Sequence, residues 1–71
     1  MDGSKMIKRL LVERNINTVE LARRINCGTA NIYNKYKRNN FSLNELEEIA
    51  ESCGCYIDIS FIDKESGKKI L

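Results

Sequence analysis

The chain has 71 residues and contains no histidine, no proline and no tryptophan. Without histidine there is no imidazole to activate a cysteine or serine as a nucleophile, the role that histidine most often has in catalysis. The four glutamates between positions 45 and 51 fall around a predicted helix as a solvated surface, so they do not converge as a catalytic pair would. The sequence therefore predicts a protein that is not an enzyme.

Cysteine is present but does not form an obvious framework. The three cysteines, Cys27, Cys53 and Cys55, are odd in number and stand in apolar contexts without secretory features. A structural zinc site needs four ligands, and three cysteines without a histidine do not supply them. We expect the cysteines to be buried as small apolar residues in a reducing cytoplasm, with no metal and no cofactor.

Long apolar runs are missing as well. The apolar residues near the N-terminus are interrupted by charged ones within a few positions, so they form neither a signal sequence nor a membrane span. No internal repeat, proline-rich linker or low-complexity tract divides the chain. We expect one soluble, cytoplasmic domain over residues 1–71 that makes no membrane contact, and its small core favours self-association.

The net charge of +2 hides a strong asymmetry along the chain. Residues 1–41 hold nine basic and three acidic groups, a balance of +6, whereas residues 42–71 hold three basic and seven acidic groups, a balance of −4. A basic half of this kind is the electrostatic footprint expected for binding to phosphates. The acidic half would be repelled by nucleic acid and is expected to face away from it.

A short helix is predicted over about residues 18–25. Asn17 can cap its start, and Glu20 is placed three residues later to complete a capping box. The small and apolar side chains of this segment fall on one inward stripe, which consists of Leu21, Ala22 and Ile25. Ala22 is small at the point where a second helix must cross closely.

A tight turn and a second short helix follow directly. Asn26 can adopt the left-handed backbone conformation that a sharp turn requires, and Gly28 can be the N-cap of a helix over about residues 29–37. Ile32 and Tyr36 recur four residues apart on the inner face of this helix. Its outer face carries polar and small residues, which are Thr29, Ala30, Tyr33, Asn34 and Lys37.

Two further helices are predicted on either side of this motif, over about residues 4–14 and 43–53. Ser4 can cap the first of these helices, and Ser42 with Glu45 can form a capping box on the other. Their predicted inner faces are Met6, Ile7, Leu10 and Leu11 in the first, and Leu43, Leu46, Ile49, Ala50 and Cys53 in the second. Gly54 is placed to end the latter helix in the left-handed conformation.

After Cys55 the hydrophobic period changes from about four to two. Ile57, Ile59 and Phe61 alternate with polar residues, which predicts a strand over about residues 55–62 with one apolar face. A short second strand over 68–71 could complete a hairpin, although an isolated hairpin is only marginally stable. Pairing across a homodimer would complete the sheet, so we expect these three apolar residues to mediate dimerisation.

The segment NTVELARRINCGTANIYNKY, residues 17–36, resembles the helix-turn-helix of the phage-repressor or Cro-like family, also called XRE. That family reads roughly Gln-x-x-Leu-Ala-x-x-Leu-Gly-Val-Ser-Gln-x-x-Ile-Ser. The scaffold positions agree, whereas Thr18 and Thr29 replace glutamines, Gly28 replaces a hydroxyl cap and Asn26 replaces glycine. The resemblance implies a mainly α, lambda-repressor-like domain of about four helices, followed here by a C-terminal β element.

The resemblance also implies a function and a set of contacts. It predicts a sequence-specific DNA-binding transcriptional regulator, in particular a repressor, that binds an operator in double-stranded DNA as a homodimer. By matching motif positions, helix 29–37 would enter the major groove. The DNA-binding residues would be Thr29, Ala30, Tyr33 and Asn34 at base edges, Thr18, Lys37, Arg38 and Asn39 at phosphates, and Gly28 at the start of the helix.

Other interpretations compete with these assignments. The two-helix motif could be an ordinary helical hairpin, and Tyr33 a surface aromatic residue without a target. For Lys35 and Arg38, solvation of the helix surface is the simpler interpretation. The replaced glutamines favour a second function class, a protein-interaction module on a helix-turn-helix scaffold, such as a phage inhibitor or an antitoxin partner. Asn34 is the strongest candidate for base readout, because its carboxamide can pair bidentately with adenine.

Overall fold

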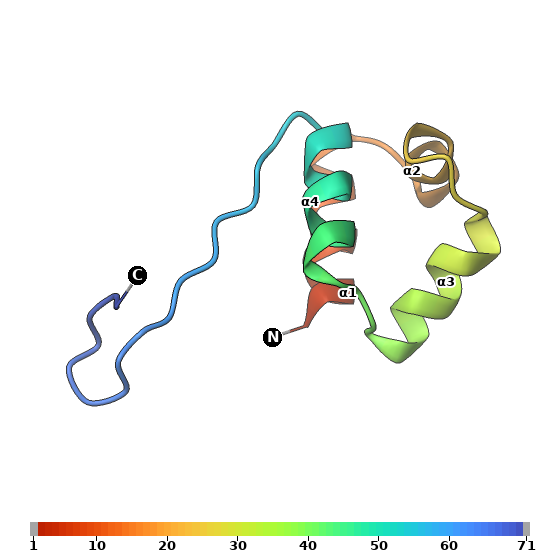
Figure 1. Cartoon of the computed structure of the whole chain (residues 1–71). Helices are drawn as coiled ribbons and strands as arrows, with labels where there is room; N and C mark the ends of the chain where they lie inside the picture. Colours follow the sequence, from red (N-terminus) through yellow and green to blue (C-terminus); the bar gives the residue numbers. More distant parts are fainter. Residues whose placement is uncertain (1, 71) are drawn as a thin grey trace.

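The computed structural model describes residues 2–70 and contains four α-helices within that range. They are α1 (Gly3–Arg14), α2 (Thr18–Arg24), α3 (Thr29–Arg38) and α4 (Leu43–Ser52). All four predicted helices are present, with ends within one residue of the expected positions. Figure 1 shows α2 and α3 on one side of the helical body, and the chain after α4 leaving on the opposite side.

Most helix ends are formed by the residues that the sequence indicated. The Asn17 side chain accepts a hydrogen bond from the Glu20 backbone N–H at 2.8 Å. Ser42 and Glu45 form the expected capping box, and Gly54 has the expected positive φ of 72°. Each of these devices satisfies a backbone group that the helix leaves without an internal partner. The local sequence therefore determines these helix ends directly.

The predicted cap of α1 was wrong. Asp2, not Ser4, is the N-cap, and its carboxylate accepts from the Lys5 backbone N–H at 3.0 Å. Ser4 lies instead in the first turn of α1 and is buried, with 6% of its surface exposed. Its hydroxyl donates to the Tyr36 carbonyl oxygen. Serine is common both at the N-cap and in the first turn of a helix. Its contact with α3 is a tertiary one, which the local sequence pattern does not reveal.

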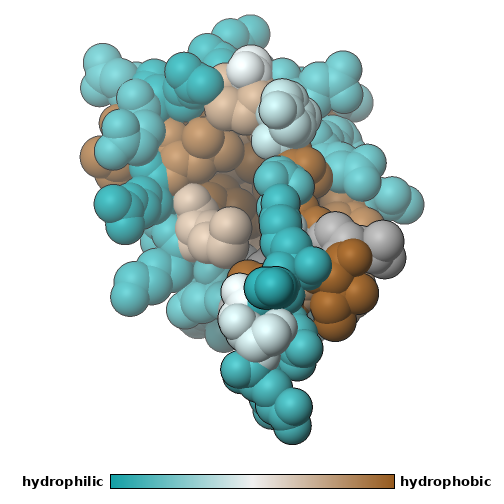
Figure 2. Space-filling view, turned by 90° about the vertical axis from the view of Figure 1, so that its left-hand side faces the viewer, coloured by the Kyte–Doolittle hydropathy of each residue, from teal (hydrophilic) through white to brown (hydrophobic). Residues whose placement is uncertain are grey.

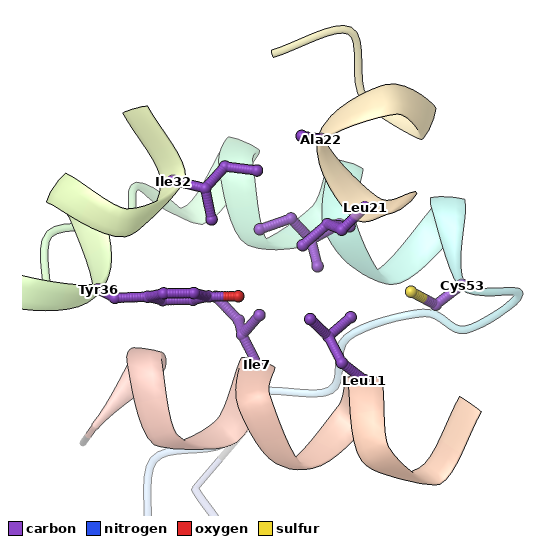
Figure 3. Packing of buried hydrophobic residues seen from close by; sticks show 8 residues of the cluster. Ile7, Leu11, Leu21, Ala22, Ile32, Tyr36 and Cys53 are labelled. Carbon is purple, nitrogen blue, oxygen red and sulfur yellow. The ribbon is translucent and has the colours of Figure 1, made fainter. Parts of the chain in front are cut away.

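One cluster of side chains from all four helices forms the core (Figure 3). Its buried members are Ile7, Leu11, Leu21, Ala22, Ile32, Tyr36, Ile49 and Cys53. Two residues predicted for the inner faces do not belong to it, since Met6 is 52% and Leu43 is 51% exposed. Both lie at the edge of their helix stripe, where a period of 3.6 residues alone does not determine which side faces the core.

The strand predicted over 55–62 is not formed. Residues 56–60 make no backbone–backbone hydrogen bond with any other part of residues 2–70. A strand requires a neighbour to pair its N–H and C=O groups, and the single chain offers none here. The alternation of apolar and polar residues is real, but it specifies a face and not a pairing partner.

Beyond this extended stretch, the chain turns back on itself. A single antiparallel bridge joins Ile62 and Lys69, flanked by hydrogen bonds from Asp63 N to Lys68 O and from Ile70 N to Phe61 O. The predicted strand at 68–71 is reduced to this bridge, and its last residue lies outside the described residues. We call residues 55–70 the C-terminal arm. No helix in the described part of the chain is long and apolar enough to cross a membrane.

Candidate nucleic-acid interface

The turn between α2 and α3 holds the two helices in a fixed relation. Asn26 has the predicted left-handed conformation, with φ of 53°, and the Cys27 N–H donates to the Ala22 carbonyl at 2.9 Å. Gly28 is the N-cap of α3, as expected. Leu21 is fully buried and Ala22 nearly so, which allows α2 and α3 to approach closely. In this arrangement one face of α3 is buried, and the opposite face is exposed to solvent.

That outward face of α3 carries most of the residues predicted to read bases. Ala30, Tyr33 and Asn34 are exposed, and Thr29 is half-buried at the first turn. Lys37 and Arg38 are exposed at the end of the helix. The exposed residues of this set form no hydrogen bond or ion pair within residues 2–70, so their polar groups are available to a groove. The structure thus brings these candidates together on one helix surface.

Tyr36 connects the inner side of α3 with the start of α2. Its hydroxyl lies 3.3 Å from the Thr18 hydroxyl, and the Lys8 ammonium group lies over its ring, 5.0 Å from the centroid. Tyr33 packs edge-on against the same ring at 5.9 Å. Sequence reasoning missed Lys8, because a contact between residues 28 positions apart has no local signal.

Asn39, a predicted phosphate contact, has a different set of partners in the protein itself. It ends α3 in the left-handed conformation, with φ of 51°. Its carboxamide oxygen accepts from the Ser4 backbone N–H at 3.0 Å and lies 3.3 Å from the Ser4 hydroxyl. The side chain therefore joins the end of α3 to the beginning of α1.

The simpler interpretation of Lys35 was that it only solvates the helix surface. In the structure it is bound by a residue of α4. Its ammonium group forms an ion pair with the Glu45 carboxylate, and both side chains are about one-third exposed. The hydrogen bond from Lys35, and then that from the Ser42 backbone, lowers the pKa of Glu45 below its ordinary value. This ion pair fixes α3 to α4 on the side away from Tyr33.

The basic groups of α2 are paired within their own helix. Arg23 and Arg24 both donate to the Glu20 carboxylate, at 2.7 and 2.9 Å, and these bonds lower the pKa of Glu20 to about 2. Glu20 was expected to reach back to the N-cap, but its carboxylate binds the two arginines instead. Glu20 therefore offsets part of the positive charge that the sequence places in α2.

The residues predicted to mediate dimerisation lie on the C-terminal arm, on the opposite side of the molecule from α3 (Figure 1). Ile57 is half-buried, whereas Ile59 and Phe61 are exposed. Figure 2 shows apolar surface on both sides of the arm where it crosses the helical body. A groove of about 300 Å³ opens there between α1 and α4, lined by Met6, Ile7, Leu10, Leu46, Ile49, Ala50, Cys55, Tyr56 and Ile57.

Two helices joined by a tight left-handed turn, with the second exposed along its outer face, define a helix-turn-helix domain. Within residues 2–70, no cluster of histidine, cysteine, aspartate or glutamate side chains could hold a metal ion.

The family model of the Cro/C1-type helix-turn-helix DNA-binding domain matches residues 6–58, and the chain belongs to this family. The match supports a DNA-binding regulator, and domains of this family are typically not enzymes. No curated protein and no solved structure gave a match.

Proposed function

We propose that the protein is a sequence-specific transcriptional repressor of the cytoplasm that binds its operator as a homodimer and acts by occluding the site. The observation that supports this proposal most directly is the exposure of polar side chains on the outward face of α3. Within residues 2–70, its exposed side chains form no hydrogen bond or ion pair, so their polar groups are available to DNA. The half of the chain that contains α3 also carries the positive charge.

In this proposal α3 enters the major groove with its first two turns against the base edges. Asn34 is the principal reader, because a carboxamide can donate to and accept from adenine at once. Tyr33 contacts a thymine methyl group or a phosphate, supported from behind by the ring of Tyr36. Thr29 and Ala30 are small enough to allow the helix to lie deep in the groove.

The flanking residues position the helix on the phosphates. Lys37 and Arg38 supply charge at the end of α3, and Thr18 supplies a hydroxyl at the start of α2. A Cβ added at Gly28 would meet only the Asn31 side chain, at an ordinary 3.5 Å. Packing within the chain therefore does not require glycine there, and its bare Cα leaves room for the DNA backbone.

The homodimer is proposed to form through the C-terminal arm, with Ile57, Ile59 and Phe61 at its centre. The unpaired backbone of residues 56–60 is an exposed edge, and a second copy related by a two-fold axis can pair with it. Because the arm lies away from α3, both recognition helices remain free. They should then lie about 34 Å apart and read an operator with two-fold symmetry.

Selection from a pool of random DNA duplexes, followed by sequencing, tests the proposal directly. The expected product is a pair of inverted half-sites whose centres are separated by about ten base pairs. The affinity should also fall steeply with salt, with a slope corresponding to roughly four to eight phosphates per dimer. Enrichment of no sequence would contradict specific recognition.

A second candidate function is favoured by the arm. Phe61, Ile62 and Ile70 are each more than 60% exposed, which is unusual for large apolar residues of a small protein that acts alone. In this alternative the arm binds a different protein, as an inhibitor or antitoxin partner would. A flat dependence of DNA affinity on salt, together with failure of the selection, would favour it over the repressor.

A further inference from the structure

We infer that Ser4 and Asn39 form a latch that sets the direction of the recognition helix, so that these two residues act as positioning residues for DNA readout. The inference rests on the proposed function in one respect, namely that α3 reads DNA. It assigns Asn39 a role other than the phosphate contact expected from its motif position. It also gives a DNA-binding role to Ser4, which no motif identifies.

The latch consists of three contacts between residues that are 32 or 35 positions apart. The Ser4 hydroxyl donates to the Tyr36 carbonyl oxygen at 2.8 Å. The Ser4 backbone N–H donates to the Asn39 carboxamide oxygen at 3.0 Å, and the Ser4 hydroxyl lies 3.3 Å from the same oxygen. Ser4 is buried, so its bond to the Tyr36 carbonyl forms where water competes little, whereas its two contacts with the exposed Asn39 side chain are partly buried.

Each partner satisfies a backbone group at a helix end. The Ser4 N–H is one of the first N–H groups of α1, which have no acceptor within the helix, and the Tyr36 carbonyl belongs to the last turn of α3. The two ends also lie close together, since a Cβ added to Gly3 would meet the Asn39 carboxamide oxygen at 3.5 Å. The end of α3 is thereby attached to the start of α1 at one defined point.

This attachment holds the end of α3, and it therefore helps to set the direction of the helix axis. The start of α3 follows the tight turn from α2, and its end is held by the latch. Asn34 lies five residues before Asn39, so a change in the direction of the helix axis displaces its carboxamide relative to a base edge. Bidentate contacts require the donor and acceptor to be placed within about 0.5 Å. Ser4 is buried and therefore influences DNA only through α3.

The chain offers well-matched variants for a test. Asn39→Gly removes the carboxamide but retains the left-handed conformation that glycine adopts readily, so the protein should still fold. Ser4→Ala removes the hydroxyl alone. Asn15→Gly is the control, because Asn15 also ends a helix in the left-handed conformation, with φ of 57°. The Asn15 side chain forms no hydrogen bond within residues 2–70.

Binding should be measured for each variant on the duplex selected by the wild-type protein and on a scrambled duplex, at one salt concentration. Asn39→Gly and Ser4→Ala should each lower the ratio of the two affinities by about threefold to tenfold, the order expected for one lost hydrogen bond. The double variant should lose little more than Asn39→Gly alone, because both act on one element. Asn15→Gly should leave the ratio unchanged.

Two results would overturn the latch. An equal loss on both duplexes for Asn39→Gly, with Ser4→Ala silent, would identify Asn39 as a direct phosphate contact. A lower melting temperature with an unchanged affinity ratio would make the contacts merely structural.

Residual dipolar couplings of the free protein provide a second measurement that does not need DNA. They should show a changed angle between α1 and α3 in Asn39→Gly and in Ser4→Ala, but not in Asn15→Gly. Unchanged couplings would overturn the latch even where no duplex is selected. A changed angle with failed selection would instead contradict the proposed function and leave the latch in place.

Discussion

The helical body, residues 2–54, and the C-terminal arm differ in how far their backbone polar groups are hydrogen-bonded and their apolar side chains are buried. In the body, side-chain caps complete the starts of α1, α2 and α4, and one core collects apolar residues from every helix. In the arm, residues 56–60 lack backbone partners, and Phe61, Ile62 and Ile70 are exposed. The body is therefore complete by itself, whereas the arm has the composition of an element that requires a neighbour.

The largest effect should come from removing a core side chain of the body. Leu21→Ala creates a cavity between α2 and the other helices and should lower the free energy of unfolding by about 2 to 5 kcal/mol. Phe61→Ala, an equally apolar change in the arm, should cost less than about 0.5 kcal/mol. Urea denaturation of both variants, at a protein concentration low enough to keep the chain monomeric, would compare their free energies of unfolding. Similar losses would contradict the division into body and arm.

Deleting the arm after Gly54 should separate folding from association. We expect the helical circular dichroism signal to persist, because Cys55 is the only arm residue packed against the core cluster. Association and operator affinity should fall together, since both depend on the dimer. Sedimentation of the full-length protein is the reference measurement. A monomer at tens of micromolar, a typical range for weak dimers, would contradict dimerisation through the arm.

Two substitutions on α3 examine the outward face of the body. Asn34→Ala should cost roughly 1 to 3 kcal/mol of binding on the selected operator and hardly change binding to a scrambled duplex. Lys37→Ala removes only a charge and should weaken both by a similar factor while reducing the salt slope by about one. Filter binding of both variants on both duplexes suffices. Equal losses for Asn34→Ala would show that this residue does not read bases.

The smallest effect concerns the attachment of α3 to α4. Because Lys35 lowers the pKa of Glu45, the ion pair stabilises the fold above the ordinary glutamate pKa of 4.5, and this contribution is lost as the pH falls below that value. Glu45→Gln keeps the capping geometry but removes the charge, and should cost under about 1 kcal/mol at pH 7 because solvent screens the pair.

Thermal denaturation at pH 7 and at pH 3 would measure the difference, with Glu48→Gln as a control for the loss of one carboxylate on the same helix. A cost that is the same at both pH values would show that the charge of Glu45 is not involved.

How far the sequence predicts this molecule depends on the range of each interaction. Asn17, Asn26, Ser42 and Gly54 act on backbone groups a few residues away, so their roles could be read from local pattern. The burial of Ser4 could not, because its partners lie more than 30 positions along the chain.

The candidate site shows the same division. Periodicity placed Ala30, Tyr33 and Asn34 outward, since Ile32 and Tyr36 fix the opposite side of the helix. It did not reveal the ion pair of Lys35 with Glu45 or the contact of Asn39 with Ser4, both of which depend on how α3 meets other helices. The strand was overpredicted because alternation describes a single segment, whereas a ladder belongs to two.

The two sides of α3 are under different structural constraints, and this affects which of its residues can be substituted during evolution. Ile32 and Tyr36 are tied to the other helices, whereas Ala30, Tyr33 and Asn34 are not needed to bury the core. Substitutions at the latter positions should therefore cost little stability, so the outward face of α3 can change without a compensating gain in stability elsewhere. Descendants of this chain would be expected to keep the inward residues of α3 while exploring many combinations at the outward ones.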